Sequence, residues 1–561
     1  MENRRSSRCT LYILKGIVMG NLLVQAIFPL IIILLSAKSV INSANEEDKY
    51  TFGAAVVEYH PVDNSSLTPE ERLEARTKSF IDLLKQVELD LDIIVFPESV
   101  LTPFVNETEF YSEVPKPFEV ILCNSTDKRY KDYLKELSCA AVKYNTTIVV
   151  NTVEKENCTS NNSTGFCPSS GIVLYNTNVA FDRNGFVSGR YRKWNLYGEY
   201  QLSVPPTAEL VTITTKNNNT FGIFTCFDIL FNVPALNLTR DLAIKNIIFP
   251  THWFSELPYL TALQTQQMWA HENNVNLLAA GGNNPRSGSG GSGIFIGEKG
   301  PLATAFIGGV GGTIAIAKKV PRLDIPNNPY LNMTPIDENV DELAKNLDSV
   351  KLIVDKTLNR HTNVVVNTNK STIIEEVCNG ELSKLCCQFN ITVDINETIQ
   401  GQHAYVYQMV VFSGIRSYNG GTVEVGLELC GVIACLNDSL SSCGQRYSNY
   451  EDIVWPITFK SISISATFPD DLNRIQYPNS LLSSLRPILP RHTIWKKEKI
   501  GGRVVRTHIL NEPQNRVLTF GIFGRDFNRD STVSPNKSAE LQALSFPLVL
   551  SICLILHLTM F

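Results

Sequence analysis

The sequence has no excess of positive charge and few features of unstructured chains. Its 50 lysine and arginine residues are outnumbered by 55 aspartate and glutamate residues, which gives a formal net charge of −5. Because phosphate binding requires clustered basic side chains, this balance argues against nucleic acid as a partner. The chain also lacks internal repeats and long low-complexity runs, and 43% of its residues are hydrophobic. We therefore expect a folded globular protein, and 561 residues predict two domains rather than one.

Residue patterns that hold metals or phosphates are missing as well. No group of cysteines and histidines has zinc-ligand spacing, so the sequence predicts no metal site. No organic cofactor is expected either. The glycine-rich segment Ser287–Gly293 is not followed by the Lys-Ser/Thr pair of a phosphate-binding loop. We expect this segment to form a flexible loop instead.

Both ends of the chain carry signals typical of secreted, membrane-attached proteins. Basic residues precede the apolar run Leu22–Leu35 and small residues follow it, which predicts a signal peptide over residues 1–44. At the other end, the apolar stretch Leu544–Phe561 follows a small, polar segment and has no basic residue behind it. This layout predicts a linker and glycosylphosphatidylinositol-anchor signal over residues 528–561. A retained N-terminal anchor and a true C-terminal transmembrane helix are the alternatives.

Sequons and cysteines support an extracellular location. The chain has fifteen Asn-x-Ser/Thr sequences, and such glycan acceptors belong on the surface of secreted proteins. Of the 13 cysteines, Cys9 and Cys553 lie in the two end segments. Setting Cys226 aside leaves ten, an even number that suits five disulfides in an oxidising compartment.

Between the end segments, the sequence divides into two regions of different texture. Residues 45–336 alternate strand-like and helix-like patterns, which predicts an α/β domain. A helix is expected from Pro69 to about Val87, because Thr68 and Glu71 form a capping box at its start. Residues 337–527 are rich in alternating valine, threonine and isoleucine and hold six cysteines, so we expect a mostly β domain with three disulfides. The clearest strand patterns in the first region are Phe52–Tyr59, Asp92–Phe96, Thr146–Thr152, Thr220–Phe224, Asn246–Phe249 and Val275–Ala280.

Three polar residues stand where apolar strands end. Cys226 closes a strand at a strand-to-helix turn, a place where backbone N–H groups favour a thiolate. Glu98 directly follows a second strand, where partial burial suits a general base. Lys193 ends the second arm of a predicted hairpin with a two-residue turn at Asn184-Gly185, and it could hold a developing oxyanion. The alternatives without a catalytic role are a core cysteine, a salt-bridged glutamate and a solvated lysine.

Together these residues match one known pattern. Phe96-Pro97-Glu98, Arg192-Lys193-Trp194 and Phe224-Thr225-Cys226 resemble the Glu, Lys and Cys signatures of the nitrilase superfamily in order and spacing. Longer stretches, at residues 189–197, 221–235 and 247–281, are similar to the vanin and biotinidase branch. The resemblance implies an α/β fold: a nitrilase-type α-β-β-α sandwich, followed here by the smaller, mostly β C-terminal domain.

The resemblance also implies the chemistry. A Cys226 thioester would form during hydrolysis of a linear amide, with Glu98 moving protons and with Lys193 and the backbone N–H of Phe227 holding the oxyanion. Glu199 matches a second glutamate that positions the lysine. His252, where relatives carry a small residue before the tryptophan at Trp253, predicts an altered substrate pocket.

The substrate is left open by the sequence. A surface anchor favours pantetheine, split to pantothenate and cysteamine, over biocytin or another biotinyl amide. A catalytically idle binding protein at the cell surface is a third alternative, and the intact set of Glu98, Lys193 and Cys226 argues against it. A papain-like protease would need a histidine partner, and none of the eight histidines lies in that family's signature.

Overall fold

The computed structural model describes residues 47–61, 64–87, 91–158, 167–309, 311–332, 339–380, 384–399 and 401–531. The predicted signal peptide and nearly all of the predicted anchor signal lie outside these residues. Within them, no helix is both long enough and apolar enough to span a bilayer.

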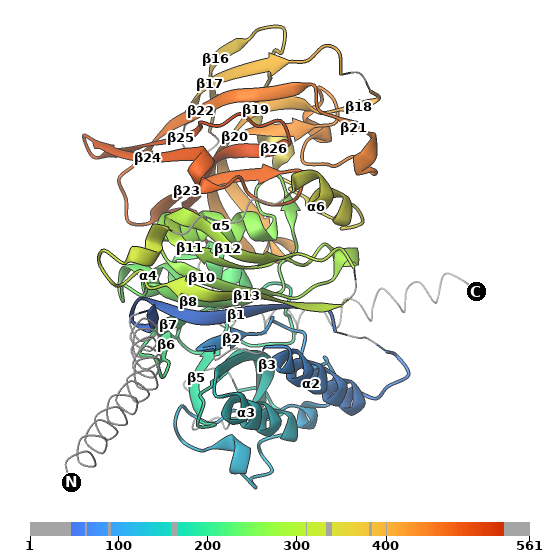
Figure 1. The fold of residues 1–561 in the computed structure, drawn as a ribbon, viewed down its shortest axis with the longest axis vertical. Coiled ribbons are helices and arrows are strands. Elements are labelled where there is room, and N and C mark those ends of the chain that lie inside the picture. The colour runs from blue at the N-terminus through green and yellow to red at the C-terminus, as the bar shows by residue number, and fades with distance from the viewer. Residues whose placement is uncertain are drawn as a thin grey trace, which may run out of the picture.

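Two six-stranded sheets form the first half of the chain (Figure 1). The first has the order β13-β1-β2-β3-β4-β5 and the second the order β12-β11-β10-β8-β7-β6. Each of the six predicted strands is present, with ends shifted by a few residues. The first sheet contains β1 (Thr51–Tyr59), β2 (Ile93–Val95), β3 (Thr147–Asn157), β4 (Ile172–Phe181), β5 (Val187–Arg192) and β13 (Gly312–Pro321). The second contains β6 (Val211–Thr214), β7 (Thr220–Ile223), β8 (Asn246–Thr251), β10 (Asn276–Gly281), β11 (Ser292–Ile296) and β12 (Gly300–Ala305).

Helices cover the outer faces of both sheets, which confirms the predicted α-β-β-α sandwich. In β1, Ala55 and Val57 pack with the helices α2 (Pro69–Lys85) and α3 (Asp132–Tyr144). The alternating residues Ala54 and Val56 belong instead to the core shared with the second sheet, as the two-residue period of a strand requires. The helix α5 (Ala262–Asn273) covers the second sheet, and Figure 1 shows it between that sheet and the C-terminal region.

The predicted start of α2 is confirmed, whereas the predicted hairpin forms with a longer loop. The capping box of Thr68 and Glu71 is present at the start of α2. The hairpin of β4 and β5 also forms, but its loop is one residue longer than predicted. Asp182 N–H donates to the Phe186 carbonyl, and Gly185, with φ at 85°, takes the left-handed position of a three-residue loop.

The glycine-rich segment Ser287–Gly293 does not form a flexible loop. Gly288, Ser289, Gly290 and Gly291 are all buried. The N–H of Gly291 donates to Glu58 at 3.0 Å, and a Cβ atom on Gly290 would lie 2.6 Å from the Phe306 ring. Glycine is needed here because neighbouring groups approach the backbone closely.

The C-terminal region is a β-sandwich of two five-stranded sheets, as its alternating pattern predicted. One sheet has the order β15-β19-β20-β26-β23 and the other β16-β17-β22-β25-β24. The first contains β15 (Thr362–Val365), β19 (Val406–Tyr418), β20 (Val423–Cys435), β23 (Arg474–Leu482) and β26 (Val517–Asp526). The second contains β16 (Thr372–Asn379), β17 (Leu385–Ile395), β22 (Ile457–Pro469), β24 (Thr493–Ile500) and β25 (Arg503–Leu510). Shorter elements are α4 (Asn237–Arg240), α6 (Val340–Asn346), β9 (Glu256–Leu257), β14 (Ile353–Val354), β18 (His403–Ala404) and β21 (Ile453–Val454).

Five disulfides are present, and Cys226 is the one free cysteine of the described residues, which confirms the expected count. Three of the disulfides staple the C-terminal sandwich, and Cys387–Cys430 joins its two sheets. The five disulfides are Cys123–Cys139, Cys158–Cys167, Cys378–Cys386, Cys387–Cys430 and Cys435–Cys443.

Among the predicted glycan acceptors in the described residues, all but the half-buried Asn237 are exposed.

The two halves meet over a buried surface around α5. Glu272 at the end of α5 forms an ion pair with Arg506, and β14 pairs with β9 of the first half. α5 is buried nearly along its whole length because strand β23 packs on the side that faces away from the second sheet. The predicted division of the chain into residues 45–336 and 337–527 stays a prediction.

Candidate active site

The ends of three strands bring Glu98, Lys193 and Cys226 together. Glu98 follows β2, Lys193 follows β5 and Cys226 follows β7. The Nζ atom of Lys193 lies 2.7 Å from Glu98 Oε1 and 2.6 Å from Glu199 Oε2. Exposure is only 2% for Glu98, 2% for Lys193 and 6% for Cys226, so these polar groups are withdrawn from water. The solvated-lysine alternative is therefore wrong.

Cys226 occupies a strained turn. Its φ angle of 45° lies in the left-handed region, which a residue with a side chain adopts at a cost of about 1–3 kcal/mol. Residues Cys226–Leu230 form a single short helical turn after β7. The N–H of Phe227 belongs to the first residues of this turn, whose N–H groups lack partners within the helix. This N–H is therefore available beside the sulfur, as the oxyanion role requires.

A buried carboxylate, Asp228, holds this turn in place, and the sequence analysis assigned it no role. It accepts hydrogen bonds from Thr225 N–H at 3.0 Å and from the Tyr191 hydroxyl at 2.6 Å. Its other oxygen accepts both the backbone N–H and the side-chain amide of Asn195 at 2.8 Å. Burial raises the pKa of Asp228 to about 6, and these hydrogen bonds oppose that effect. Asp228 thereby ties the cysteine turn to the segment that carries Lys193.

Three asparagines form a network around Glu98 that sequence reasoning also missed. Asn176 Nδ2 donates to Glu98 Oε1 at 2.8 Å and also bonds Glu199. Asn151 in turn donates to the side-chain oxygens of Asn176 and Asn178 at 2.6 and 2.9 Å. Asparagine is depleted in strands, so three of them in otherwise apolar strand patterns are a signal that could have been used.

The pKa values of Cys226 and Glu98 are shifted in opposite directions. Burial raises the pKa of Cys226, and the charge of Glu98 raises it further, while the Lys193 ammonium opposes both effects. Burial also acts to raise the pKa of Glu98, but the charge and hydrogen bond of Lys193 outweigh it, so that this pKa lies below its usual value. Burial therefore works against a thiolate at Cys226, whereas the Lys193 ammonium favours it.

His252 and Trp253 lie on the wall of a cavity next to Cys226. The N–H of His252 donates to Glu98 Oε2 at 2.9 Å, and its ring Nε2 lies 3.1 Å from Ser289 Oγ. The Trp253 indole donates to the Leu260 carbonyl at 2.8 Å. The cavity is lined by Tyr197, Cys226, Phe227, Leu230, His252, Trp253, Phe254, Glu256, Leu260 and Tyr418. Its mostly aromatic wall suits the apolar part of a small organic substrate.

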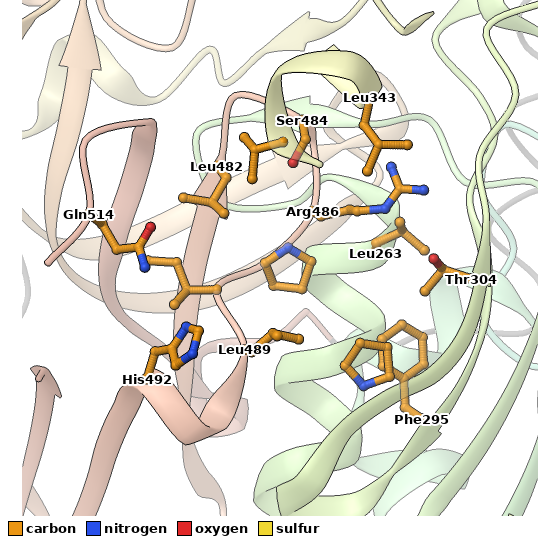
Figure 2. A pocket seen from close by; sticks show the side chains of 14 residues that line it. Leu263, Phe295, Thr304, Leu343, Leu482, Ser484, Arg486, Leu489, His492 and Gln514 are labelled. Atoms are coloured by element: carbon orange, nitrogen blue, oxygen red, sulfur yellow. The ribbon is translucent and has the colours of Figure 1, made fainter. Parts of the chain in front are cut away.

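A second cavity lies away from this chemistry. It is lined by side chains of α5, β11 and β12 and by the segment that follows β23, including Leu263, Phe295 and Ser484 (Figure 2). None of its lining residues belongs to the cluster of Glu98, Lys193 and Cys226. In the described residues, the one group spaced like metal ligands contains two cysteines that form a disulfide, so it offers no thiolate.

Comparison with known proteins gives matches over both halves of the chain. Residues 54–300 match the family model of carbon-nitrogen hydrolases, and residues 350–530 match that of the vanin C-terminal domain. Vanin-like protein 3 of Drosophila melanogaster is 34% identical over 507 residues, which cover 88% of this chain and 92% of that protein. Pantetheinase of Homo sapiens is 29% identical, over 88% of this chain and 92% of that protein.

Two further matches have lower sequence identity. Biotinidase of Homo sapiens is 27% identical, over 89% of this chain and 93% of that protein. A solved structure from Saccharomyces cerevisiae, of a member of branch 10 of the nitrilase superfamily, is 20% identical with a TM-score of 0.36. It covers 48% of this chain and 90% of its own.

Proposed function

Because the chain belongs to the carbon-nitrogen hydrolase family, in its vanin-like group, we propose that it cleaves a linear, non-peptide amide through a thioester at Cys226. The observation that carries this proposal is the buried thiol next to the ion pair of Glu98 and Lys193, at the wall of an aromatic cavity. Such a cluster provides a nucleophile, a proton acceptor and a fixed cation within one site.

The first half-reaction acylates the enzyme. The carboxylate of Glu98 accepts the proton of the Cys226 thiol as the sulfur attacks the amide carbon. The carbonyl oxygen becomes an oxyanion, which receives hydrogen bonds from the Phe227 N–H and from Lys193. An ammonium has three donors, and Glu98 and Glu199 occupy two of those of Lys193. The tetrahedral intermediate then collapses, and Glu98 returns the proton to the departing amine nitrogen.

The second half-reaction releases the acid. Glu98, again a carboxylate, accepts a proton from a water molecule whose oxygen attacks the thioester carbon. The same donors hold the second oxyanion. When the carbon–sulfur bond breaks, the sulfur takes up the proton from Glu98, and a carboxylic acid leaves the site. In this scheme Glu199 and Asn176 are positioning residues, because they hold Lys193 and Glu98 in place.

We propose pantetheine as the substrate, giving pantothenate and cysteamine. The relatives named pantetheinase support this choice. The relative named biotinidase makes biocytin the competing substrate. Incubation of the purified protein with pantetheine, biocytin and simple acyl amides, with the acids identified by mass spectrometry, tests the proposal. Pantothenate release is expected, and release of biotin alone would replace pantetheine with biocytin.

We further propose that the protein acts at the outer face of the cell membrane through a glycosylphosphatidylinositol anchor. Five disulfides and exposed glycan acceptors support an extracellular location. A phosphatidylinositol-specific phospholipase is expected to release the protein from intact cells. Release by detergent alone would mean that the C-terminal segment is retained as a membrane helix.

A further inference from the structure

The C-terminal sandwich reaches into the candidate active site. Tyr418, the last residue of β19, lines the cavity, and its ring centroid lies 5.2 Å from that of Phe227, the residue after the nucleophile. The next residue, Asn419, accepts the N–H of Gly198 at 3.0 Å and donates to the Leu196 carbonyl at 3.1 Å. The cavity wall is therefore built from both halves of the chain.

A buried charge cluster lies directly behind Tyr418. The Arg416 guanidinium stacks 4.3 Å from the centre of the Tyr418 ring. It forms a bidentate ion pair with Glu256, a residue of the cavity wall, and its NH1 lies 3.2 Å from Asp355. Two carboxylates thus share one guanidinium, so these three groups together carry one excess negative charge, and Lys356 offsets part of its effect on Glu256. At low dielectric such an excess acts strongly on a charged group in the cavity.

The Tyr418 hydroxyl is a buried polar group without a hydrogen-bond partner among the described residues. The whole residue is only 8% exposed. Buried polar groups are nearly always paired, and leaving one unpaired costs about 1–3 kcal/mol. A cavity whose wall includes Tyr418 is suited to a ligand that supplies the missing partner.

We propose that Tyr418 and the Glu256–Arg416 pair determine which acyl chain this enzyme accepts. The Tyr418 hydroxyl hydrogen-bonds a hydroxyl group of the chain. The negative excess around Glu256 and Asp355 rejects chains that end in a carboxylate. This inference rests on the proposed function and deepens it, because it assigns substrate selection to a residue of the C-terminal sandwich.

Substitution of the tyrosine tests the hydrogen bond. Tyr418→Phe keeps the ring and removes only the hydroxyl. We expect kcat/KM for pantetheine to fall about tenfold, while an analogue with its hydroxyls replaced by hydrogen is affected less than twofold. Tyr407→Phe is the matched control, because this hydroxyl of the same strand bonds the Val517 carbonyl and does not line the cavity. An unchanged ratio of the two substrates in Tyr418→Phe would overturn the inference.

A binding measurement separates this inference from the proposed function. In a Cys226→Ala background, where no thioester can form, the Kd of pantetheine is measured with and without Tyr418→Phe. A rise in Kd of about tenfold is expected for a lost hydrogen bond. An equal Kd overturns the role of Tyr418 whatever the turnover, whereas absent turnover in the wild type overturns only the proposed function.

The charge of the cluster is tested by Glu256→Gln. We expect the ratio of kcat/KM for a succinyl amide to that for a neutral acyl amide to rise about tenfold, because the negative excess is removed. Glu272→Gln is the control, since Glu272, like Glu256, is a half-buried partner of an arginine but lies outside the cavity wall. Equal substrate ratios in the wild type and Glu256→Gln would show that the charge does not select.

Discussion

Two consecutive residues, Arg192 and Lys193, have similar electrostatic surroundings, but only Lys193 lies near the candidate nucleophile Cys226. Each is buried, and each bonds two carboxylates. Arg192 binds Glu154 through Nε at 3.0 Å and through NH2 at 2.5 Å, and its NH1 lies 3.0 Å from Glu156. Lys193 binds Glu98 and Glu199 at 2.7 and 2.6 Å. Neighbouring residues at the end of a strand point to opposite sides, so the two clusters do not share partners.

The two clusters differ in the group that each basic side chain acts on. Arg192 stacks on Tyr175, with its guanidinium 4.0 Å from the ring centre. Lys193 instead acts on the Cys226 thiol, which lines a cavity. A buried ion pair is therefore not by itself a sign of catalysis, since structural networks create the same charges. An ion pair beside a nucleophile and an open space is a candidate site.

The largest difference between the two clusters is expected at the Cys226 thiol, which only the Lys193 cluster contains. Cys226→Ala is expected to lower turnover at least about 10³-fold, because no other group of the Lys193 cluster can form the acyl-enzyme. The five disulfides do not involve Cys226, so folding is expected to persist. Product formation and thermal unfolding are measured together. A variant that folds normally and still releases the acid at the wild-type rate would remove Cys226 from the mechanism.

The next largest effect on turnover distinguishes Glu98, which binds Lys193, from Glu154, which binds Arg192. Glu98→Gln is expected to lower kcat by about 10²–10⁴-fold, because proton transfer is lost in both half-reactions. Any thioester that forms then persists, and intact-mass spectrometry is expected to detect it. Glu154→Gln is the matched control, because Glu154 is equally buried but bonds Arg192. It is expected to lower stability and to leave kcat within about threefold. A comparable fall in kcat for both variants would erase the distinction between the clusters.

Much of the candidate site could be predicted because it lies at strand ends. Glu98 and Cys226 follow apolar strands, and Lys193 follows the second strand of a hairpin. The strands before Glu98 and Lys193 end at the same edge of the first sheet, whereas Cys226 comes from the second sheet. The α2 helix was predictable for a similar reason, since Thr68 and Glu71 form a local signal. Features that depend on a few neighbouring residues are visible in a single sequence.

The features that were missed depend on distant residues. Tyr418 reaches the cavity only through the packing of the C-terminal sandwich on the first half, and no local pattern encodes that contact. The sequence of the glycine-rich segment at 287–293 indicates flexibility, yet the N–H of Gly291 donates to the buried Glu58. The raised pKa of Cys226 likewise follows from burial, which the motif alone does not reveal.

Removal of the lysine sharpens the role of its charge. Lys193→Ala is expected to lower kcat/KM by about 3 kcal/mol, or roughly 10²-fold, by analogy with the loss of an oxyanion-hole donor. The ammonium holds the Cys226 pKa down against burial, so its removal raises that pKa still further. Alkylation of Cys226, which requires the thiolate, is therefore expected to shift to higher pH. If the alkylation profile against pH stays unchanged, Lys193 does not act on the sulfur.

The smallest effect on turnover is expected for Arg192, whose side chain points to the opposite side of the strand from that of Lys193. Arg192→Lys keeps the positive charge but loses the bidentate contact with Glu154, since an ammonium cannot reproduce the guanidinium fork. We expect unfolding to become easier by about 1–3 kcal/mol. Turnover is expected to stay within about twofold, because Arg192 contacts neither the thiol nor the cavity wall. Thermal unfolding and kcat are measured on the same preparation. A large loss of kcat without a loss of stability would mean that the two clusters are coupled through the strand, and that the chemistry extends beyond Lys193.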